Sequence, residues 1–351
     1  MGLSPARRGR IYFLEQNQQA LDDKYRYTLR ELQFVIPGCN DGFRFLGSCH
    51  GLLCLAPYRG RNLLLSYICN PFTRQHVRLP NPISPLKDHE RKLRFGRDYR
   101  ALGFGLCDKT LEYKVVEIVR REPCDAVRAK CSKSKVFVFT LGDECWREKG
   151  DVPYAVRTEL WARNVFVNDA LHWFCSFPPN SILSFDVGDE VFRVIPCPEF
   201  GHARGFHSTD VLSGRLSITI KLSTGTVEIW IMLDYGVKES WTKYFSILEI
   251  GGWDLRFSQT LCFQGDGKLL FLNDRKTLLL YDPQTRRMEV LKVRGLPSSF
   301  EAVTQVASLV SPRGCTPRPI EKRNADGNTI ACKESKGKSR LSWIFRRNSN
   351  R

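Results

Sequence analysis

The sequence has 351 residues, 42% hydrophobic and 26% charged, a balance that lets most of the chain fold around a core. Its 54 Lys and Arg exceed its 37 Asp and Glu, giving a net charge of +17 that is compatible with an acidic partner. No apolar run approaches the roughly 20 residues of a bilayer span, and the first residues hold no apolar signal core. We therefore expect no membrane partner, no membrane-spanning helix and no secretory signal.

The first 31 residues contain one candidate helix and no clear repeat. That candidate, Gln16–Arg30, is polar and only weakly periodic. Residues 1–31 are therefore predicted to form a lead-in, partly helical, that precedes the main domain.

The main domain is predicted to span residues 32–311 and to be all-β. Short runs of β-branched and aromatic residues alternate with turn residues through this region, as strands do. No window of about 15 residues shows a helical stripe. Representative runs are Tyr113–Val119, Val136–Thr140, Ile182–Phe185, Val227–Met232 and Leu278–Tyr281.

A unit of strands and turns recurs in the second half of the chain. Asp186, Asp234 and Asp282 follow equivalent strands and are spaced by 48 residues each time. Asn70 and Asp282 begin matching N/D-P-x-T turns, where an Asx side chain bonds its own backbone. Units of roughly 45–50 residues with three or four strands have the length of a propeller blade. We predict a propeller-like array of about five to seven blades, with a sandwich or several unrelated sheets as the alternative.

Two basic segments interrupt the repeat in the first half. Leu86–Arg100 has a net charge of +3 and Arg120–Lys135 a net charge of +4. They flank consecutive strands, so they could share one face and steer acidic partners toward it. The alternative is a pair of solvated loops with no partner. The candidate partner-binding residues are Lys87, Arg91, Lys92, Arg94, Arg97, Arg120, Arg121 and Arg128.

The last segment, residues 312–351, is predicted to be a disordered basic tail. It holds 11 basic and 3 acidic residues, and its composition cannot bury enough apolar area to offset chain entropy. Leu341–Phe345 is its one apolar stretch. Two basic clusters have the spacing of a bipartite nuclear import signal, although an inert solvated tail is the alternative. These clusters are Lys322 with Arg323, and Lys336, Lys338 and Arg340.

Cysteine usage indicates a reducing compartment. The chain has 13 cysteines and no C-x-x-C pair, so neither a disulfide framework nor a zinc site is favoured. We expect a location in the cytoplasm or nucleus, with thiols filling the core. Those in or beside apolar segments are Cys69, Cys107, Cys175, Cys197 and Cys262.

Motifs that carry chemistry are not found. There is no G-x-x-x-x-G-K-[ST] phosphate loop and no G-x-S-x-G elbow. His202 and His207 lie in a glycine-flanked loop without metal-ligand spacing, and His172 is predicted to be a hydrogen-bonded core histidine. We predict no catalytic, cofactor-binding or metal-binding residues and therefore no enzyme.

Several blocks, in order along the chain, match the motifs of one domain family. Gly47–Leu55 (GSCHGLLCL) resembles an S-C-N-G-L-L-C-L block, with His50 in place of Asn. Gly103-Phe-Gly105 with Tyr113–Val116 resembles G-F-G … Y-K-V-V. Further matches lie in Cys69–Arg74 with Leu79-Pro80, in Val165–Trp173 with Asp169 replacing Gly, in Ile182–Glu190, and from Ile229 to Trp241. Together these blocks resemble the plant F-box associated domain, a kelch-like β-propeller type.

The resemblance implies a non-enzymatic module that recognises protein substrates for a Skp–cullin–F-box ubiquitin ligase. Met1–Leu46 does not match the F-box that usually precedes such a domain, so docking of the Skp adaptor on this chain is not expected. A nucleic-acid or acidic-protein binder that uses the basic segments and tail is the second hypothesis, and a propeller enzyme the third.

Trp173, Trp230 and Trp241 are predicted to be largely buried.

Overall fold

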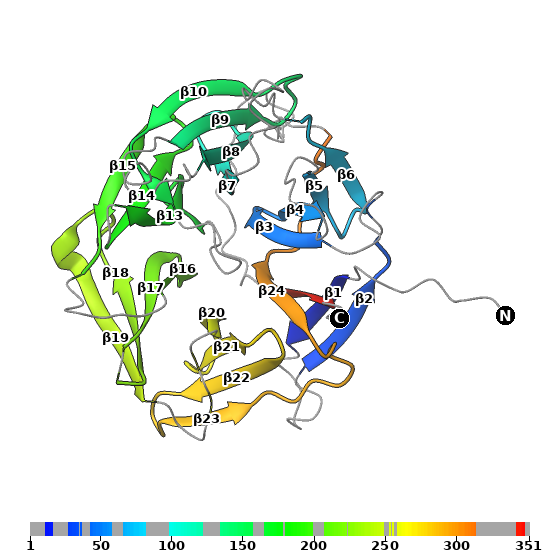
Figure 1. Cartoon of the computed structure of the whole chain (residues 1–351). Coiled ribbons are helices and arrows are strands. Elements are labelled where there is room, and N and C mark those ends of the chain that lie inside the picture. The colour runs from blue at the N-terminus through cyan, green and yellow to red at the C-terminus, as the bar shows by residue number, and fades with distance from the viewer. Residues whose placement is uncertain are drawn as a thin grey trace, which may run out of the picture.

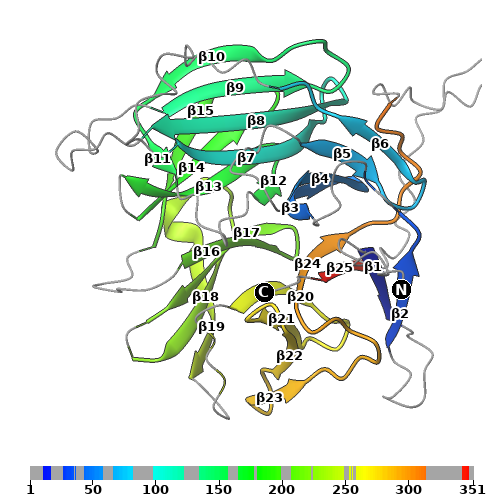
Figure 2. The same ribbon diagram turned by 45° about the vertical axis from the view of Figure 1, so that its right-hand side comes forward.

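The computed structural model describes residues 11–16, 27–34, 36, 43–57, 66–81, 98–121, 134–156, 165–177, 180–198, 207–222, 224–248, 253, 255, 258–313 and 342–347. Within these residues the strands form six antiparallel sheets arranged in a ring (Figures 1 and 2). The fold is therefore an all-β propeller, and its sheets are numbered here as blades I to VI. Six blades lie within the expected range.

Blades I to III come from the first half of the chain. Blade I holds β3 (Phe43–Cys49), β4 (Leu52–Pro57), β5 (Tyr67–Asn70) and β6 (Gln75–Arg78). Blade II holds β7 (Asp98–Cys107), β8 (Glu112–Arg121), β9 (Ser134–Thr140) and β10 (Arg147–Val152). Blade III holds β11 (Ala155–Val156), β12 (Val165–Val167), β13 (Ala170–Phe177), β14 (Ser181–Asp186) and β15 (Phe192–Pro196), with β11 and β12 both paired to β13.

Blades IV and V follow in sequence, and blade VI joins the two ends of the chain. Blade IV holds β16 (His207–Leu212), β17 (Arg215–Lys221), β18 (Thr226–Met232) and β19 (Trp241–Leu248), with the 3₁₀ turn Lys238–Ser240 before β19. Blade V holds β20 (Ser258–Phe263), β21 (Leu269–Asn273), β22 (Thr277–Asp282) and β23 (Arg287–Val290). Blade VI holds β24 (Phe300–Gln305), β25 (Ser342–Arg347), β1 (Ile11–Gln16) and β2 (Tyr27–Leu32).

Burial along the strands follows their position in a blade. The third strands of blades III and V, β14 and β22, are buried on both faces because each blade packs between two others. Their sequences, SILSFD and TLLLYD, are accordingly almost continuously apolar. The outermost strand β23 is mostly exposed. The core is therefore a set of apolar layers between adjacent blades.

Two glycines of blade II allow blade III to pack closely against it. A Cβ on Gly103 would lie 2.5 Å from a ring carbon of Trp173, and one on Gly105 would lie 2.5 Å from the ring of Phe166. The G-F-G block of β7 is thus explained by the two aromatic rings that approach it.

The amino-terminal segment differs from the prediction. Instead of a partly helical lead-in over residues 1–31, β1 and β2 form the two outer strands of blade VI, and residues 17–26 between them lie outside the described residues. The helix expected over Gln16–Arg30 is wrong at both of its ends, which are extended. Local propensity was overridden because a strand here pairs with segments distant in sequence.

The tail also differs in part from the expected disorder. Ser342–Arg347 forms β25, which pairs with β24 on one side and β1 on the other. The rest of the tail from residue 314 lies outside the described residues. Sequence reasoning missed this strand because a single short strand is stable only when its neighbours already exist.

Tight turns define one end of the propeller, called the turn end here. In blades I to V the antiparallel order places the first-to-second and third-to-fourth connections at this end. Examples are His50-Gly51, Asp108–Leu111, Asn168-Asp169, Val187–Val191 and Leu233–Ser240. The opposite end, the insert end, carries the second-to-third connections and the links between blades.

Among the described residues, no helix is long and apolar enough to span a bilayer.

Candidate functional site

The two basic segments are attached to neighbouring strand ends at the insert end. The pairing of β7 with β8 sets Asp98 opposite Arg121, and the pairing of β8 with β9 sets Arg120 opposite Ser134. The start of β7, the end of β8 and the start of β9 therefore lie next to one another.

Most of the candidate partner-binding residues lie in the connections themselves. Lys87, Arg91, Lys92, Arg94, Arg97 and Arg128 fall outside the described residues. Arg120 and Arg121 belong to β8, so the second basic connection is shorter than the expected Arg120–Lys135 and runs over residues 122–133. The five import-signal candidates, Lys322, Arg323, Lys336, Lys338 and Arg340, also fall outside the described residues.

Cations on the strands below this end are held by acidic partners. Arg100 on β7 contacts Glu117 on β8 at 2.7 Å, and the Glu117 side chain is only 1% exposed. Lys135 at the start of β9 pairs with Glu148 on β10 at 2.9 Å. Carboxylates thus neutralise these two cations of the strands. By sequence, residues 82–97 hold five basic and two acidic residues, and residues 122–133 hold three basic and two acidic residues.

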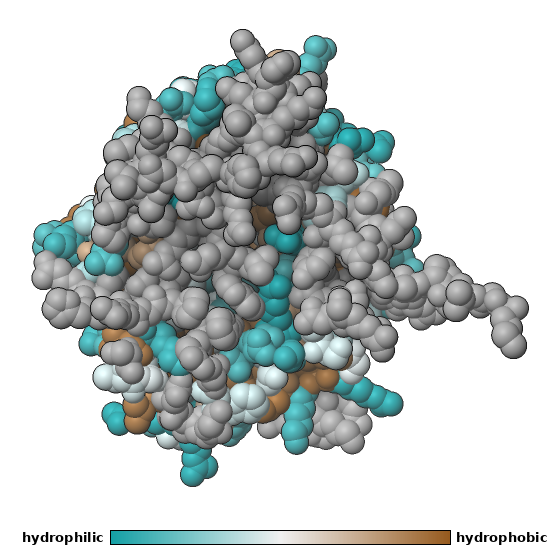
Figure 3. All heavy atoms as spheres, in the orientation of Figure 1, coloured by the Kyte–Doolittle hydropathy of each residue, from teal (hydrophilic) through white to brown (hydrophobic). Residues whose placement is uncertain are grey.

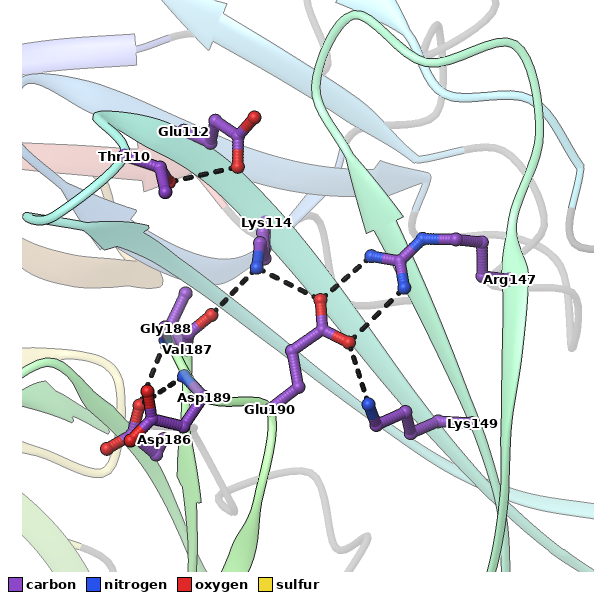
Figure 4. A network of polar contacts seen from close by, with 10 residues as sticks. All are labelled: Thr110, Glu112, Lys114, Arg147, Lys149, Asp186, Val187, Gly188, Asp189 and Glu190. Atoms are coloured by element: carbon purple, nitrogen blue, oxygen red, sulfur yellow. Dashed lines mark hydrogen bonds and ion pairs between the residues drawn. The ribbon is translucent and has the colours of Figure 1, made fainter.

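At the turn end, a network of polar contacts between blades II and III centres on Glu190, in the turn between β14 and β15 (Figure 4). Its carboxylate accepts hydrogen bonds from Lys114 on β8 at 2.9 Å and from Arg147 on β10 at 2.8 Å, and it lies 3.1 Å from Lys149. Lys114 also donates to the Val187 carbonyl at 3.0 Å. One carboxylate of blade III therefore joins two strands of blade II.

The partners of Glu190 dominate its ionisation. Burial of the carboxyl, which is 9% exposed, would by itself raise its pKa. Hydrogen bonds from Arg147, Lys114 and Lys149 outweigh that effect and hold the pKa at about 2. Glu190 is consequently ionised at neutral pH and acts as an interblade link, not as a proton donor.

Two aspartates meet beside this network. Burial and the neighbouring, hydrogen-bonded carboxyl of Asp108 raise the pKa of Asp169. Asp169 also has φ of 54°, and His50, on blade I, has φ of 43°. These are the two places where the chain departs from the Gly and Asn of the resembled motifs, and both require the left-handed backbone that Gly and Asn tolerate best.

His172 is a hydrogen-bonded core residue, as predicted. It is fully buried, its Nδ1 lies 3.2 Å from the Val165 carbonyl and its Nε2 lies 2.7 Å from the Tyr235 hydroxyl. Ser184 also contacts that hydroxyl at 3.0 Å. Burial lowers the pKa of His172 to about 4, so the imidazole is neutral at pH 7. The trio links blade III to the β18–β19 turn of blade IV.

Burial confirms the cysteine predictions and most of the tryptophan predictions. Cys69, Cys107, Cys175, Cys197 and Cys262 are all buried and free. Trp173 and Trp241 are buried, whereas Trp230 is only half-buried, with its ring 5.3 Å below the Lys243 ammonium. In the part of the chain that the structure describes, no three His, Cys, Asp or Glu side chains are grouped to hold a metal ion.

Six antiparallel sheets arranged radially in a ring define a β-propeller. The chain matches the F-box associated beta propeller domain over residues 5–312 and belongs to that family. The chain is 30% identical over 344 residues to F-box protein At3g07870 of Arabidopsis thaliana, covering 87% of this chain and 78% of that protein. F-box protein CPR1 of the same plant is 28% identical over 264 residues, or 69% of this chain and 63% of the relative.

The sequence motifs included residues of the polar network at the turn end, but they did not indicate which residues contact one another. Glu190 was part of a matched motif, but nothing in the sequence pairs it with Lys114, Arg147 and Lys149, which lie 41 or more residues away. The left-handed turn positions were visible only as departures from a motif.

Proposed function

We propose that this chain is a non-enzymatic protein-recognition module, resembling the substrate-binding part of a Skp–cullin–F-box ubiquitin ligase. Family membership supports a recognition role because the relatives are F-box proteins. The protein partner binds at the insert end, where loops can vary without disturbing the blades.

The observation that carries this proposal is the adjacency of the two basic connections. Their anchors, Asp98 with Arg121 and Arg120 with Ser134, are paired residues of blade II. A concentrated positive surface favours encounter with an acidic partner and raises the association rate. The turn end, by contrast, has its Glu190 contacts directed between blades.

The test is affinity capture from nuclease-treated plant extract with the full chain as bait. We expect a defined protein partner that is lost when Lys87, Arg91, Lys92, Arg94 and Arg97 are changed to Glu. The control variant reverses five exposed cations of the turn end, Arg74, Arg215, Lys238, Arg286 and Arg287. Equal loss in both variants would show that net charge alone was responsible and would contradict the assigned surface.

The second candidate function is binding of nucleic acid through the same connections. It is supported by the net charge of +17. If it holds, affinity for single-stranded RNA or DNA falls steeply with salt, and nuclease treatment abolishes capture. Retention of the protein partner after nuclease treatment, together with weak nucleic-acid binding at physiological salt, favours the first function.

A further inference from the structure

A groove lies on the side of the ring, between blades V and VI and away from the basic connections. It has a volume of about 1070 Å³ and is lined by the start of β2, by β22, and by the end of β23 with the residues that follow it. These segments are Tyr27–Leu29, Thr277–Leu280 and Glu289–Leu296. Side chains of both blades therefore form its walls.

The floor of the groove is apolar. Leu278 and Leu280 belong to the buried layer between the two blades. Leu29, Leu291 and Val293 pack against that layer from the groove side and remain partly exposed. An apolar side chain that entered here would therefore continue the interblade core.

The rim of the groove is cationic. Lys268, Lys276, Lys292 and Arg294 line it, against the single carboxylate of Glu289. Asp266 and Asp274 lie 3.8 Å and 2.9 Å from Lys268 and Lys276. Lys292 and Arg294 are exposed, and within the described residues no carboxylate pairs with either. Figure 3 shows hydrophobic and hydrophilic residues side by side in the lower part of the face, where Figure 1 places blade V.

The outermost strands of both blades border this groove. β2 ends the order of blade VI and β23 ends that of blade V, so within the described residues neither has a further strand on its outer side. An edge strand presents backbone donors and acceptors that an extended chain can pair with. The groove thus combines apolar contacts, positive charge and nearby strand edges.

We propose that this groove binds an extended segment of a partner protein in which acidic and apolar side chains alternate. The period of two in an extended chain sends alternate side chains to opposite sides. Apolar side chains pack on Leu29, Leu291 and Val293, and carboxylates pair with Lys292 and Arg294. This site lies between blades V and VI, away from the two basic connections of blade II, and does not depend on the function proposed for them.

The experiment uses the full chain and a fluorescent synthetic peptide of about twelve residues in which Glu and Val alternate. Binding is measured as the rise in the fluorescence anisotropy of the peptide when the protein is added. We expect saturable binding of this peptide and none of a matched Lys–Val peptide. K292E/R294E should weaken binding about tenfold or more. R78E/R215E makes the same charge change on exposed residues of blades I and IV and should leave the affinity within about twofold.

A third variant separates groove contact from general electrostatics. Thr28 is exposed and lines the groove, so T28W narrows it without changing charge and without disturbing the core. We expect T28W to weaken the acidic peptide about fivefold or more, with an unchanged melting temperature. An unaltered affinity in T28W, or equal loss in the two charge variants, would overturn the proposal.

Other occupants give different results. A single-stranded oligonucleotide that competes with the peptide and is lost in K292E/R294E would overturn the protein ligand in favour of a nucleic acid. Sedimentation that shows a dimer of the wild-type chain and a monomer of K292E/R294E would assign the groove to a second copy. Capture through the insert end is measured with other variants, so either site can fail alone.

Discussion

Asn70 and Asp282 occupy equivalent turns but have different partners. Both side-chain oxygens accept backbone hydrogen bonds within their own turn, at 2.9 Å from Phe72 N and 2.9 Å from Gln284 N. Asn70 is fully buried, and its amide also donates to the carbonyls of Ser308 and Val310 at 2.8 Å each. One side chain thereby ties the segment after β24 to blade I.

This difference predicts opposite tolerance to the Asn–Asp exchange. Asn70→Asp replaces the donor by a carboxylate facing two carbonyls, and should lower the free energy of unfolding by about 2–4 kcal/mol. The matched exchange Asp282→Asn keeps the accepting oxygen and should leave the free energy of unfolding nearly unchanged. Urea unfolding of both variants measures this. Equal costs would show that the contacts to Ser308 and Val310 contribute nothing.

Glu190 predicts a pH-dependent stability. Its folded pKa of about 2 lies below the ordinary 4.5, so its contribution is fully present above pH 4.5 and is lost as the pH falls toward 2. Glu190→Gln should therefore cost about 2–3 kcal/mol at neutral pH, discounted for the partly exposed Arg147 and Lys149. The difference from wild type should shrink below about pH 4.5.

Glu148 provides the control for this measurement. Its ion pair with Lys135 is exposed, with side chains 47% and 43% accessible, so Glu148→Gln should cost less than about 1 kcal/mol. Unfolding by urea is followed from neutral pH down to about pH 3. A Glu190→Gln deficit that stays constant across this range would mean that packing, and not charge, explains it.

At the scale of the strand, position within the blade decides how much a side chain contributes. Trp173 on β13 is 2% exposed and packs against Gly103 of the neighbouring blade. Trp230 on β18 is half-buried, and its indole donates to Glu228 at 3.0 Å. The two tryptophans are therefore not equivalent, although both lie in largely apolar strands.

Truncation of these two residues should differ accordingly. Trp173→Ala should lower the free energy of unfolding by about 3–5 kcal/mol because it leaves a cavity between blades II and III. Trp230→Ala should cost about 1–2 kcal/mol, since solvent already covers part of the ring. Thermal and urea unfolding of both variants measure the difference, and a larger loss for Trp230→Ala would contradict the assigned burial.

For the whole molecule, closure of the ring depends on its two ends. Blade VI contains β24, β25, β1 and β2, so strands from both termini share one sheet. Glu301 on β24 adds links to other blades, accepting from Phe45 N at 3.2 Å and lying 3.5 Å from Arg275. Gly51 makes room for the segment after β24, because a Cβ there would overlap the Cβ of Ser308.

The position of β25 makes the tail a structural element. Deletion of residues 314–351 leaves β24 and β1 without the strand between them and should lower the melting temperature by on the order of 5 °C or more. Deletion of residues 348–351 keeps β25 and should leave the melting temperature unchanged. Scanning calorimetry compares the two. A full-length melting temperature after the longer deletion would show that β25 does not help to close the ring.

Local chemistry determined much of this protein. The all-β class, the repeated unit and the Asx turns at Asn70 and Asp282 were predictable, because alternation and turn residues act over a few neighbours. The buried cysteines followed for the same reason. Strand β25, by contrast, was hidden in a charged tail whose composition predicts disorder.

Only the tertiary structure decided which distant segments meet. It paired β1 with β25, set Glu190 beside Lys114 and Arg147, placed the anchors of two basic connections together, and left Trp230 half-buried. It also formed the groove between β2 and β23. These contacts form only when the ring closes and segments far apart in the sequence pack together. A pattern over a few neighbouring residues does not indicate which distant segments will meet.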